Sequence, residues 1–377
     1  MNIGFDAKRA FHNHTGLGNY ARQIINDLHE TAPENKYFLY TPSFDKNTNP
    51  LFRLTRDFPN TKITTPEGLL GKLSASIWRS NLGRYGKKHQ LDIFHGLSNE
   101  LPSGFKNSFT KKIVTIHDVI FARHPEWYSK VDAKIYHSKT KAACKTADKI
   151  IAISERTKQD LIELYQAPAE KIKVIYQSCH RRFLDNENIP FRNEIIQKYK
   201  LERPFILFVG TLNKRKNSDA LLEAYSKIAK KTDHDLIMIG SGPLKESLEA
   251  SILDMNLMER VRIYSNFPST DLPPMYQLAT YSVAPSSYEG FGIPIIESLS
   301  SKTPVLYTKG HCFEETAGKG GIEIESLHCE NFSEQLLFWI ENKKELKSYA
   351  EKGLEHVQQF SSTAATSKLL NCYQQLL

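Results

Sequence analysis

Short apolar runs alternate with stretches of helical periodicity along most of the chain. In the first half, the apolar runs predict strands at Ile3–Asp6, Tyr37–Thr41, Ile93–His95, Ile113–His117, Lys149–Ile153 and Ile172–Tyr176. The helical patterns between these runs are at Asn19–Glu30, Gly71–Lys88, Val131–Thr146 and Glu155–Tyr165. Strands that alternate with helices in this way predict parallel sheets covered by helices on both faces.

The second half repeats the alternation after a polar segment, Ser178–Arg203, which holds only one short helical pattern. The strands predicted here are Phe205–Gly210, Leu236–Gly240, Val261–Tyr264, Tyr281–Ala284, Val305–Tyr307 and Gly321–Ile324. The sequence therefore predicts an α/β protein with two Rossmann-like, doubly wound domains, over residues 1–180 and 200–357. Such sheets bind ligands beyond the carboxyl ends of their strands, so two facing sheets would enclose a cleft.

Composition narrows the class of protein. The 377 residues are 40% apolar and 24% charged, as in an ordinary globular protein, and the net charge is +8. That charge suits a nucleic acid, an anionic membrane or an acidic small molecule equally well. The five cysteines form no Cys-x-x-Cys pair, which argues against zinc and favours a reducing compartment. With no apolar leader or membrane-spanning run apparent, we expect a cytoplasmic protein.

A basic turn follows the strand that begins at Phe205. Gly210 and Thr211 open the turn, and Arg215 and Lys216 lie just before a helix predicted near Asn217. A glycine allows close backbone approach, and two cations beside a helix N-terminus favour an anion such as a diphosphate. The alternative is a solvated basic turn.

Two glutamates follow the strand Tyr281–Ala284. Glu289 lies in the loop and Glu297 lies about one turn inside the next helix, whose first turn accommodates Pro294. Carboxylates accept hydrogen bonds from sugar hydroxyls, and the intervening segment offers backbone amides. That segment is Gly290, Phe291, Gly292 and Ile293. The alternative is structural, with Glu297 as an acid that complements the helix dipole.

Weaker signals lie at other strand ends of the second half. Gly240 follows a strand within Gly-Ser-Gly-Pro, and Asn266 with Phe267 follows another and could wall a base pocket. Asp233-His234-Asp235 has the spacing of a metal–diphosphate site, but it precedes its strand and is interpreted as a turn. We therefore expect no metal site and no cofactor.

The first half carries Gly16 and Gly18 between its first strand and first helix, where a phosphate can bind. His117 and Asp118 end the strand Ile113–His117, and His95 ends another. A histidine at a strand end is either a functional side chain or a structural one.

Together these motifs resemble the retaining glycosyltransferases of family 4, which have the GT-B fold. The resemblance covers essentially the whole chain. Its most specific motif is Glu-x₇-Glu from Glu289 to Glu297, followed by Gly-Thr-Leu with Arg215-Lys216-Asn217, and then Thr-Ile-His-Asp ending at Asp118 with Gly16-Leu17-Gly18. Thr211 stands where many members have arginine, and Lys302 replaces a common glycine.

The resemblance implies roles for these residues. Glu289 and the amides of 290–293 would hold the donor sugar, Glu297 the ribose, and Arg215 with Lys216 the diphosphate. Gly16–Gly18 would approach the diphosphate from the N-terminal domain, and His117 would line the reaction centre. The N-terminal domain would bind the acceptor, and the C-terminal helix, residues 358–377, would cross back onto that domain.

The Gly-Thr-Leu variant resembles mannosyltransferases of surface polysaccharide assembly. The resemblance therefore implies GDP-mannose as donor, a UDP-hexose next, and a lipid-linked or lipopolysaccharide glycan as acceptor, with retention of anomeric configuration and no metal. Two alternatives remain, a nucleic-acid-binding or nucleic-acid-modifying protein and a sugar-nucleotide-binding protein without turnover. Scattered lysines disfavour nucleic acid.

A peripheral contact with an anionic membrane is a further hypothesis. The segment Gly71–Lys88 combines apolar and basic residues as an interfacial helix does, although a surface helix of a globular domain also fits. These residues are Leu73, Ile77, Trp78 and Leu82 with Lys72, Arg79, Arg84, Lys87 and Lys88. A second basic helix carries Lys130, Lys134, Lys139, Lys141 and Lys145, with Lys149 beyond it.

Overall fold

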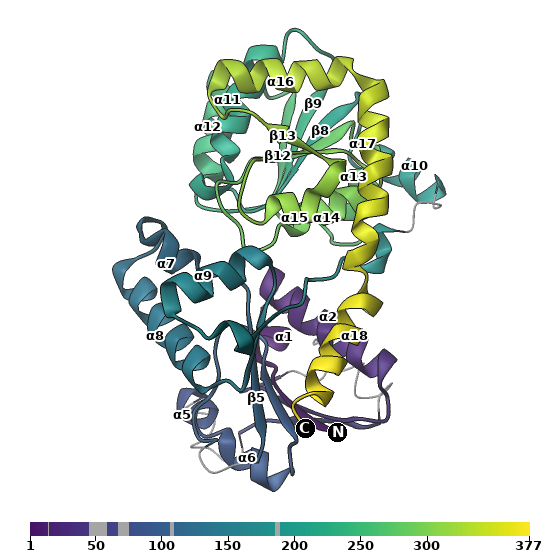
Figure 1. The fold of residues 1–377 in the computed structure, drawn as a ribbon. Coiled ribbons are helices and arrows are strands. Elements are labelled where there is room, and N and C mark those ends of the chain that lie inside the picture. The colour runs from purple at the N-terminus through teal and green to yellow at the C-terminus, as the bar shows by residue number, and fades with distance from the viewer. Residues whose placement is uncertain (14, 45–58, 67–74, 106–108, 185–188) are drawn as a thin grey trace. The chain divides into compact units, whose positions relative to one another are not determined.

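The computed structural model describes residues 1–13, 15–44, 59–66, 75–105, 109–184 and 189–377. The chain forms two compact units (Figure 1). Unit 1 comprises residues 1–177 together with 362–377, and unit 2 comprises residues 178–361. The polar segment between the sequence halves thus belongs to unit 2.

Unit 1 is built on a parallel sheet of seven strands among the described residues. In their order across the sheet, the strands are β3 (Thr61–Thr64), β2 (Lys36–Tyr40), β1 (Asn2–Asp6), β4 (Ile93–Gly96), β5 (Lys111–Ile116), β6 (Lys149–Ala152) and β7 (Ile172–Val174). This doubly wound order reverses between β1 and β4. Ligands of such sheets bind beyond the carboxyl ends of the strands at the point of reversal.

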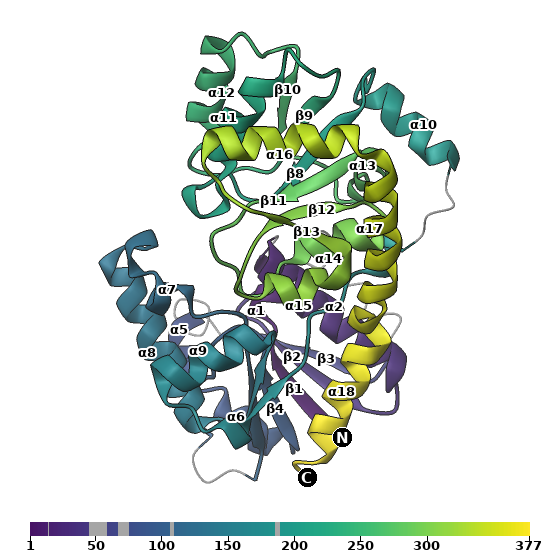
Figure 2. The same ribbon diagram turned by 45° about the horizontal axis from the view of Figure 1, so that its top comes forward.

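The helices of unit 1 include α18, which crosses back to it from the end of unit 2, as expected. They are α1 (Lys8–His12), α2 (Gly16–Thr31), α5 (Ala75–Ser80), α6 (Gly83–Lys88), α7 (Ile120–Arg123), α8 (Lys130–Thr146), α9 (Glu155–Tyr165) and α18 (Ser362–Gln374), with short 3-10 turns at Pro125–Trp127 and Ala169–Lys171. Helix α18 lies beside α2 (Figures 1 and 2). Its Leu369 and Tyr373 are buried in the same core as Ile25 and Leu28, which anchors the helix to unit 1.

Three local expectations for unit 1 were wrong. A short helix, α1, precedes α2, and α2 begins at Gly16 rather than Asn19. Strand β3 was not predicted. The expected helix Gly71–Lys88 is two helices, α5 and α6, and its first four residues lie outside the described part. The break follows from packing, because a Cβ on Gly83 would come within 2.0 Å of the Gly104 backbone.

Unit 2 holds a second parallel sheet, of six strands among the described residues. Across the sheet these are β10 (Val261–Tyr264), β9 (Asp235–Ile239), β8 (Phe205–Val209), β11 (Tyr281–Ala284), β12 (Val305–Thr308) and β13 (Gly321–Ile324). The order reverses between β8 and β11. The expectation of two doubly wound parallel sheets is confirmed.

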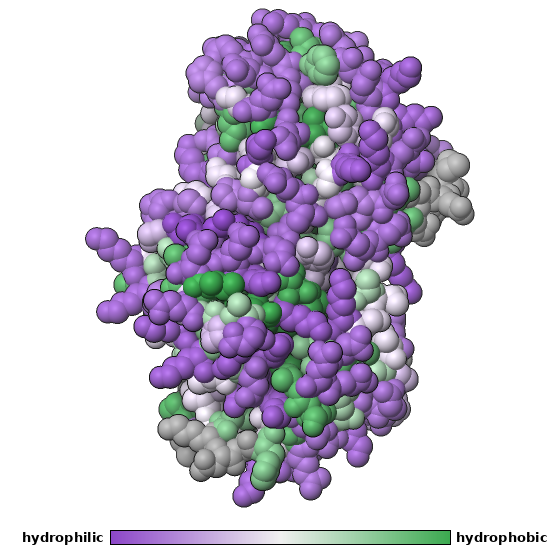
Figure 3. All heavy atoms as spheres, in the orientation of Figure 1, coloured by the Kyte–Doolittle hydropathy of each residue, from purple (hydrophilic) through white to green (hydrophobic). Residues whose placement is uncertain are grey.

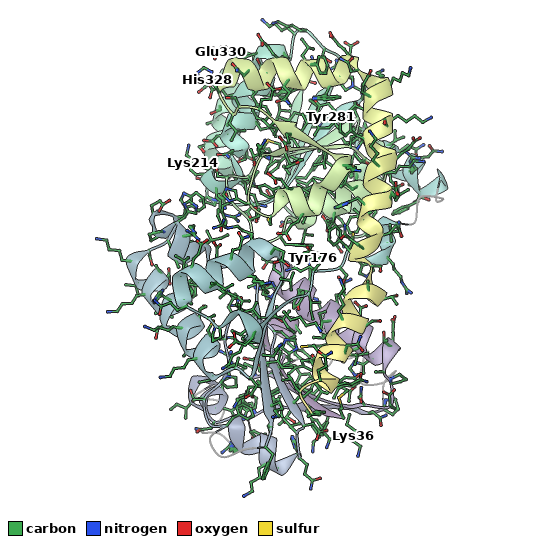
Figure 4. All side chains as sticks on the ribbon, in the orientation of Figure 1. Lys36, Tyr176, Lys214, Tyr281, His328 and Glu330 are labelled. Atoms are coloured by element: carbon green, nitrogen blue, oxygen red, sulfur yellow. The ribbon has the colours of Figure 1, made fainter. Side chains whose placement is uncertain are left out.

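Helices cover both faces of this sheet, with α11, α12 and α16 on one face and α14 and α15 on the other (Figure 2). The helices are α10 (Ile189–Lys198), α11 (Ser218–Ile228), α12 (Lys245–Asp254), α13 (Leu272–Leu278), α14 (Ile293–Ser300), α15 (Phe313–Ala317), α16 (Cys329–Glu341) and α17 (Lys343–His356), with 3-10 turns at Arg181–Phe183, Lys214–Lys216, Gly318–Gly320 and Val357–Phe360. Tyr281 ties β11 to α16, since its buried hydroxyl donates to the Leu336 carbonyl at 2.8 Å (Figure 4).

Candidate functional site

The loops after β8 and β11 meet where the strand order of unit 2 reverses. The Ser287 amide donates to the Arg215 carbonyl at 2.8 Å. The Asn217 side chain donates to the Pro285 carbonyl at 2.6 Å and to the Ser287 hydroxyl at 2.9 Å. Asn217 adopts a left-handed conformation, with φ of 48°, at the start of α11. The two predicted motifs thus form one surface although about 70 residues separate them in sequence.

Three charged side chains converge on that surface, and we name them the charge triad: Arg215, Lys216 and Glu289. The Glu289 Oε1 atom lies 2.7 Å from Arg215 Nη1 and also contacts Lys216 Nζ. Burial raises the pKa of Glu289, but Lys216 and Arg215 outweigh it and hold the pKa at about 2. The carboxylate is therefore ionised at any physiological pH.

The backbone under the charge triad is fixed by further hydrogen bonds. Arg215 Nη1 donates to the Tyr288 carbonyl at 2.6 Å, and the buried Cys312 thiol donates to the Glu289 carbonyl at 3.2 Å. Lys214, in the same turn, points away: its side chain is 73% exposed and pairs with Asp219 (Figure 4). The turn is therefore only partly the solvated basic surface that was the alternative.

One glycine lets the loop after β9 approach the loop after β8. Gly240 has a φ of +153°, and a Cβ there would come within 1.8 Å of the Gly210 carbonyl oxygen. Gly240 thus has a packing role beside the β8 loop. Gly210 itself would tolerate a Cβ, whose nearest neighbour is the Phe208 ring at 3.4 Å, and Thr211 is exposed.

The segment between the two glutamates offers its backbone rather than its side chains. Phe291 is buried and packs edge-on against Phe360, with ring centroids 5.5 Å apart. Gly292 caps α14 with a φ of +103°, a conformation that favours glycine. Gly290 and Ile293 flank it, so the amides of this segment lie at the N-terminus of an eight-residue helix.

Glu297, on α14, has a different environment from Glu289. Its Oε2 atom accepts a hydrogen bond from the Tyr276 hydroxyl at 3.2 Å. Burial raises the pKa of Glu297 to about 7, against the opposing influence of Arg182 and the Tyr276 hydrogen bond. The side chain is partly exposed, and a hydroxyl-bearing ligand would stabilise its ionised form.

The remaining predicted positions of unit 2 lie further along the sheet. Phe267 stacks on Tyr199 with centroids 4.8 Å apart, and Asn266 beside it is exposed. Asp235 pairs with Arg260 at 3.0 Å and with Arg262 at 3.2 Å at the start of β9, which accounts for the Asp-x-Asp spacing structurally. Within the described ranges, no group of three or more His, Cys, Asp or Glu residues could hold a metal.

His117 lies at the end of β5 in unit 1 and is held from both ring nitrogens. Nε2 lies 2.9 Å from the Leu97 carbonyl oxygen, which can only accept, so Nε2 carries the proton. Nδ1 is then the acceptor for the Gln177 amide at 3.0 Å. Burial lowers the pKa of His117 to about 4. The imidazole is neutral and has a fixed tautomer.

A second histidine joins a buried chain of hydrogen bonds that the sequence did not indicate. His95 Nδ1 lies 2.6 Å from the Tyr373 hydroxyl of α18, and Nε2 lies 2.8 Å from the Thr115 hydroxyl. Thr115 lies 3.2 Å from the Tyr20 hydroxyl, and Tyr20 meets the His117 ring edge-on at 4.6 Å. Burial lowers the pKa of His95 to about 3. His95 is therefore a structural residue.

The two N-terminal glycines differ in their surroundings. A Cβ on Gly18 would come within 1.8 Å of the Asn13 carbonyl oxygen, so packing of α2 against α1 requires this glycine. A Cβ on Gly16 would have no neighbour within 4 Å. Packing among the described residues thus explains Gly18, whereas Gly16 borders open space.

A pocket of about 310 Å³ lies where the strand order of unit 1 reverses. His117 and Asp118 line it from the segment after β5, Asn99 from the segment after β4, and Arg9 from α1. Phe121, Tyr128 and Tyr136 form an aromatic wall, with ring centroids 5.6–6.3 Å apart. The three wall residues come from three different elements of the chain. Their spacing in the sequence therefore follows no pattern that would predict a shared surface.

The expected interfacial helix is not formed as predicted. Trp78 and Leu82 are buried in a core with Tyr40 and Phe94, and Arg79 pairs with Asp6 and Glu100. Leu73 and Lys72 lie outside the described residues. On α8, by contrast, Val131 and Ile135 are exposed, and apolar side chains interrupt the hydrophilic surface over α8 and α9 (Figure 3). In the part of the chain that the structure describes, no helix is both long and apolar enough to cross a membrane.

Comparison with known proteins matches both units. Residues 15–178 match the model of Glycosyltransferase Family 4, and residues 191–356 match that of Glycosyl transferases group 1. O-antigen chain mannosyltransferase B of Escherichia coli is 26% identical over 291 residues, which are 75% of this chain and 74% of that protein. O-antigen chain mannosyltransferase RfbU of Salmonella typhimurium is 26% identical over 56% of each chain.

Solved structures share the fold. HepE from Anabaena, in complex with UDP and glucose, superposes over 100% of both chains with a TM-score of 0.77 and 16% sequence identity. At this identity the likeness concerns the fold alone.

Proposed function

Because this chain belongs to the glycosyltransferases of the GT-B fold and the family 4 type, as its motifs indicated, we propose that it transfers a hexose from a nucleotide sugar to a glycan or lipid-linked acceptor. Mannose from GDP-mannose is the proposed donor. The likeness to two O-antigen mannosyltransferases supports this choice and supports surface polysaccharide or lipopolysaccharide assembly as the process. We place this activity in the cytoplasm, at the cytoplasmic face of the membrane, as part of the same proposal.

The observation that carries the proposal is the charge triad beside the N-terminus of α14. Arg215 and Lys216 supply two positive charges for a diphosphate, and the adjoining Glu289 supplies an ionised acceptor for sugar hydroxyls. Glu297, about one turn inside α14, supplies a carboxylate for the ribose. We therefore assign donor binding to unit 2.

The reaction we propose retains the anomeric configuration and needs no metal. The bond between the anomeric carbon and the diphosphate oxygen breaks, and the acceptor oxygen bonds to the same face of that carbon. The departing diphosphate oxygen takes the proton of the acceptor hydroxyl. Arg215 and Lys216 stabilise the charge that develops on the leaving group, while Glu289 and the amides of 290–293 orient the sugar.

We assign acceptor binding to the pocket of unit 1. Its aromatic wall offers Tyr128 and Tyr136 for the apolar face of a pyranose, and Asn99 and Asp118 for its hydroxyls. A volume of about 310 Å³ accommodates a sugar unit. His117, neutral and held at both ring nitrogens, lies in this pocket and contributes a fixed wall rather than a titrating base.

Thermal shift with nucleotides tests the donor. GDP should raise the melting temperature increasingly with its concentration, and UDP, dTDP and ADP should do so less at the same concentrations. A UDP-hexose is the second candidate. A larger shift with UDP than with GDP would select it. A shift with none of the four would contradict the use of a nucleotide sugar.

NMR of the product tests retention, since the anomeric coupling distinguishes the two configurations. A product inverted relative to the donor would overturn the mechanism. Assays in excess EDTA test metal independence, and the expected result is unchanged activity. Loss of activity that Mg²⁺ or Mn²⁺ restores would contradict it.

We also propose that α8 contacts an anionic membrane. Val131 and Ile135 are exposed on it among Lys130, Lys134 and Lys141, a combination that suits the interface of a bilayer. Sedimentation with vesicles tests it: binding should be stronger to phosphatidylglycerol than to phosphatidylcholine and should fall in a variant with Lys134→Glu and Lys141→Glu. Equal sedimentation with both vesicles would refute the electrostatic part.

A further inference from the structure

In the charge triad, one carboxylate forms ion pairs with both cations of the proposed diphosphate site. Arg215 and Lys216 both contact the same oxygen, Oε1, of Glu289. The three side chains are 12–20% exposed, so water screens these ion pairs only partly. A diphosphate that reaches the two cations must therefore compete with Glu289.

We propose that Glu289 lowers the affinity of the site for the product nucleoside diphosphate, so that the site selects the donor over the product. This inference rests on the proposed function and adds a specificity-determining role to a residue already assigned to the sugar. It concerns what Glu289 does when no sugar is present.

Charge alone would make the two cations favour the product. A free nucleoside diphosphate carries more negative charge than the same diphosphate esterified to a sugar, so two cations alone would bind the product more tightly than the donor. Glu289 reduces the net charge of the triad from +2 to +1.

The donor replaces the ion pairs that Glu289 loses to the diphosphate, and the product does not. Sugar hydroxyls donate hydrogen bonds to Glu289 while the diphosphate takes over the cations. Once the sugar has left, Glu289 loses these donors and returns to Arg215 and Lys216. Its backbone is held in place by the Cys312 thiol, so the carboxylate is available to do so.

The test compares ligand affinities of Glu289→Gln and the unmodified protein by isothermal titration calorimetry, with GDP, UDP and inorganic pyrophosphate in metal-free buffer. Glu289→Gln keeps the shape of the side chain and removes its charge. We expect pyrophosphate and nucleoside diphosphate to bind on the order of tenfold more tightly to the variant. For the nucleotide sugar, the variant also loses the hydrogen bonds between the sugar hydroxyls and the carboxylate, which offsets the gain in affinity. The ratio of donor affinity to product affinity should therefore be lower in the variant than in the unmodified protein.

Glu345→Gln is the matched control, because it makes the same change of charge at an exposed position on α17. It should leave all affinities unchanged. Equal or weaker pyrophosphate binding by Glu289→Gln, or an equal gain in Glu345→Gln, would overturn the inference.

The variant can also be examined through its stability. Removing the carboxylate leaves two cations close together, so Glu289→Gln should melt at a lower temperature than the unmodified protein. Pyrophosphate should restore that loss, and the variant can be prepared in its presence. A destabilised variant that pyrophosphate does not restabilise more than it does the unmodified protein would contradict the inference.

The outcomes also separate this inference from the proposed function. Transfer activity in the unmodified protein without tighter pyrophosphate binding in Glu289→Gln would refute the inference alone. Tighter pyrophosphate binding in a protein that uses no nucleotide sugar would uphold the competition and refute the proposed donor.

Discussion

The two points of strand-order reversal carry opposite kinds of chemistry. In unit 2, ionised side chains meet at the ends of β8 and β11, and the pKa of Glu289 is held at about 2 by two cations. In unit 1, two neutral histidines, His95 and His117, lie at the ends of β4 and β5, and burial lowers the pKa of His117 to about 4, although the charged Arg9 and Asp118 line the same pocket. The same fold thus provides a site of permanent charge and a site of fixed neutral hydrogen bonds.

This contrast matches the two binding tasks that we propose for the two units. A diphosphate requires charge, which the short turn after β8 concentrates in adjacent residues. An acceptor sugar requires a fixed surface, and His117, a neutral imidazole with both nitrogens engaged by Leu97 and Gln177, shapes that surface without a hydrogen bond of its own to the ligand. The following variants test the two halves of the comparison.

The largest expected effect comes from the charged site. Lys216→Ala removes a cation in contact with Glu289 and should lower kcat/KM on the order of 100-fold, since it removes charge stabilisation of the leaving group. Steady-state kinetics measure it. Lys214→Ala is the matched control, because Lys214 is 73% exposed and pairs with Asp219. Similar losses in both variants would show that the basic turn acts only through its overall charge.

His117→Ala tests the neutral site. It should lower kcat roughly 10- to 100-fold through lost positioning, by the same factor at pH 6 and at pH 8. The pKa of His117 is lowered to about 4, so the ring stays neutral over this range. His124→Ala, at a partly exposed histidine paired with Glu126, is the control. A loss that changes with a midpoint near pH 6.5 would show that His117 titrates, and the contrast would fail.

Glu297→Gln tests whether every carboxylate of unit 2 is permanently charged. Burial raises the pKa of Glu297 to about 7, so ligand-free protein loses stability as pH rises from 4.5 to 7. Glu297→Gln should therefore melt higher than the unmodified protein at pH 8 and similarly below pH 4.5.

Nucleotide affinity should follow the same titration in the opposite direction. It should rise up to about tenfold from pH 6 to pH 8, because the ionised carboxylate is the better acceptor for ribose hydroxyls. Titration calorimetry at each pH measures it. Glu297→Gln should abolish the rise, and a 2′,3′-dideoxynucleotide should not show it. A rise that persists in the variant would assign the titration to another group.

The smallest effect concerns the support of the neutral site. Tyr373→Phe removes the hydroxyl beside His95 Nδ1 and should cost about 1–3 kcal/mol in the free energy of unfolding, since a buried polar atom loses its partner. Urea unfolding measures it, with Tyr349→Phe, on α17 of unit 2, as control. An unchanged stability would show that His95 needs no partner there.

The periodic patterns of the sequence were sufficient to predict the two parallel sheets and the order of most strands and helices along the chain. Strand β3 escaped because only Ile63 in it is apolar. The sequence predicts one helix across α5 and α6 because their composition is continuous, whereas the contact of Gly83 with Gly104 that separates them is tertiary.

The sequence predicts the motifs of the candidate site, but it does not predict the contacts between them. Arg215 and Glu289 were identified separately, yet their ion pair depends on the parallel pairing of β8 with β11. The tautomer of His117 depends on Gln177, which lies 60 residues further along the chain. The network through Tyr373 depends on α18 returning to unit 1.

The return of α18 also sets an order of events during synthesis. Unit 2 is continuous in sequence, whereas unit 1 is split, with residues 362–377 translated only after the whole of residues 178–361. The nascent first 177 residues therefore leave the ribosome with the surface that Leu369 and Tyr373 will cover still open to water. Unit 2 can complete its core first, and the first unit to be translated is the last to be finished.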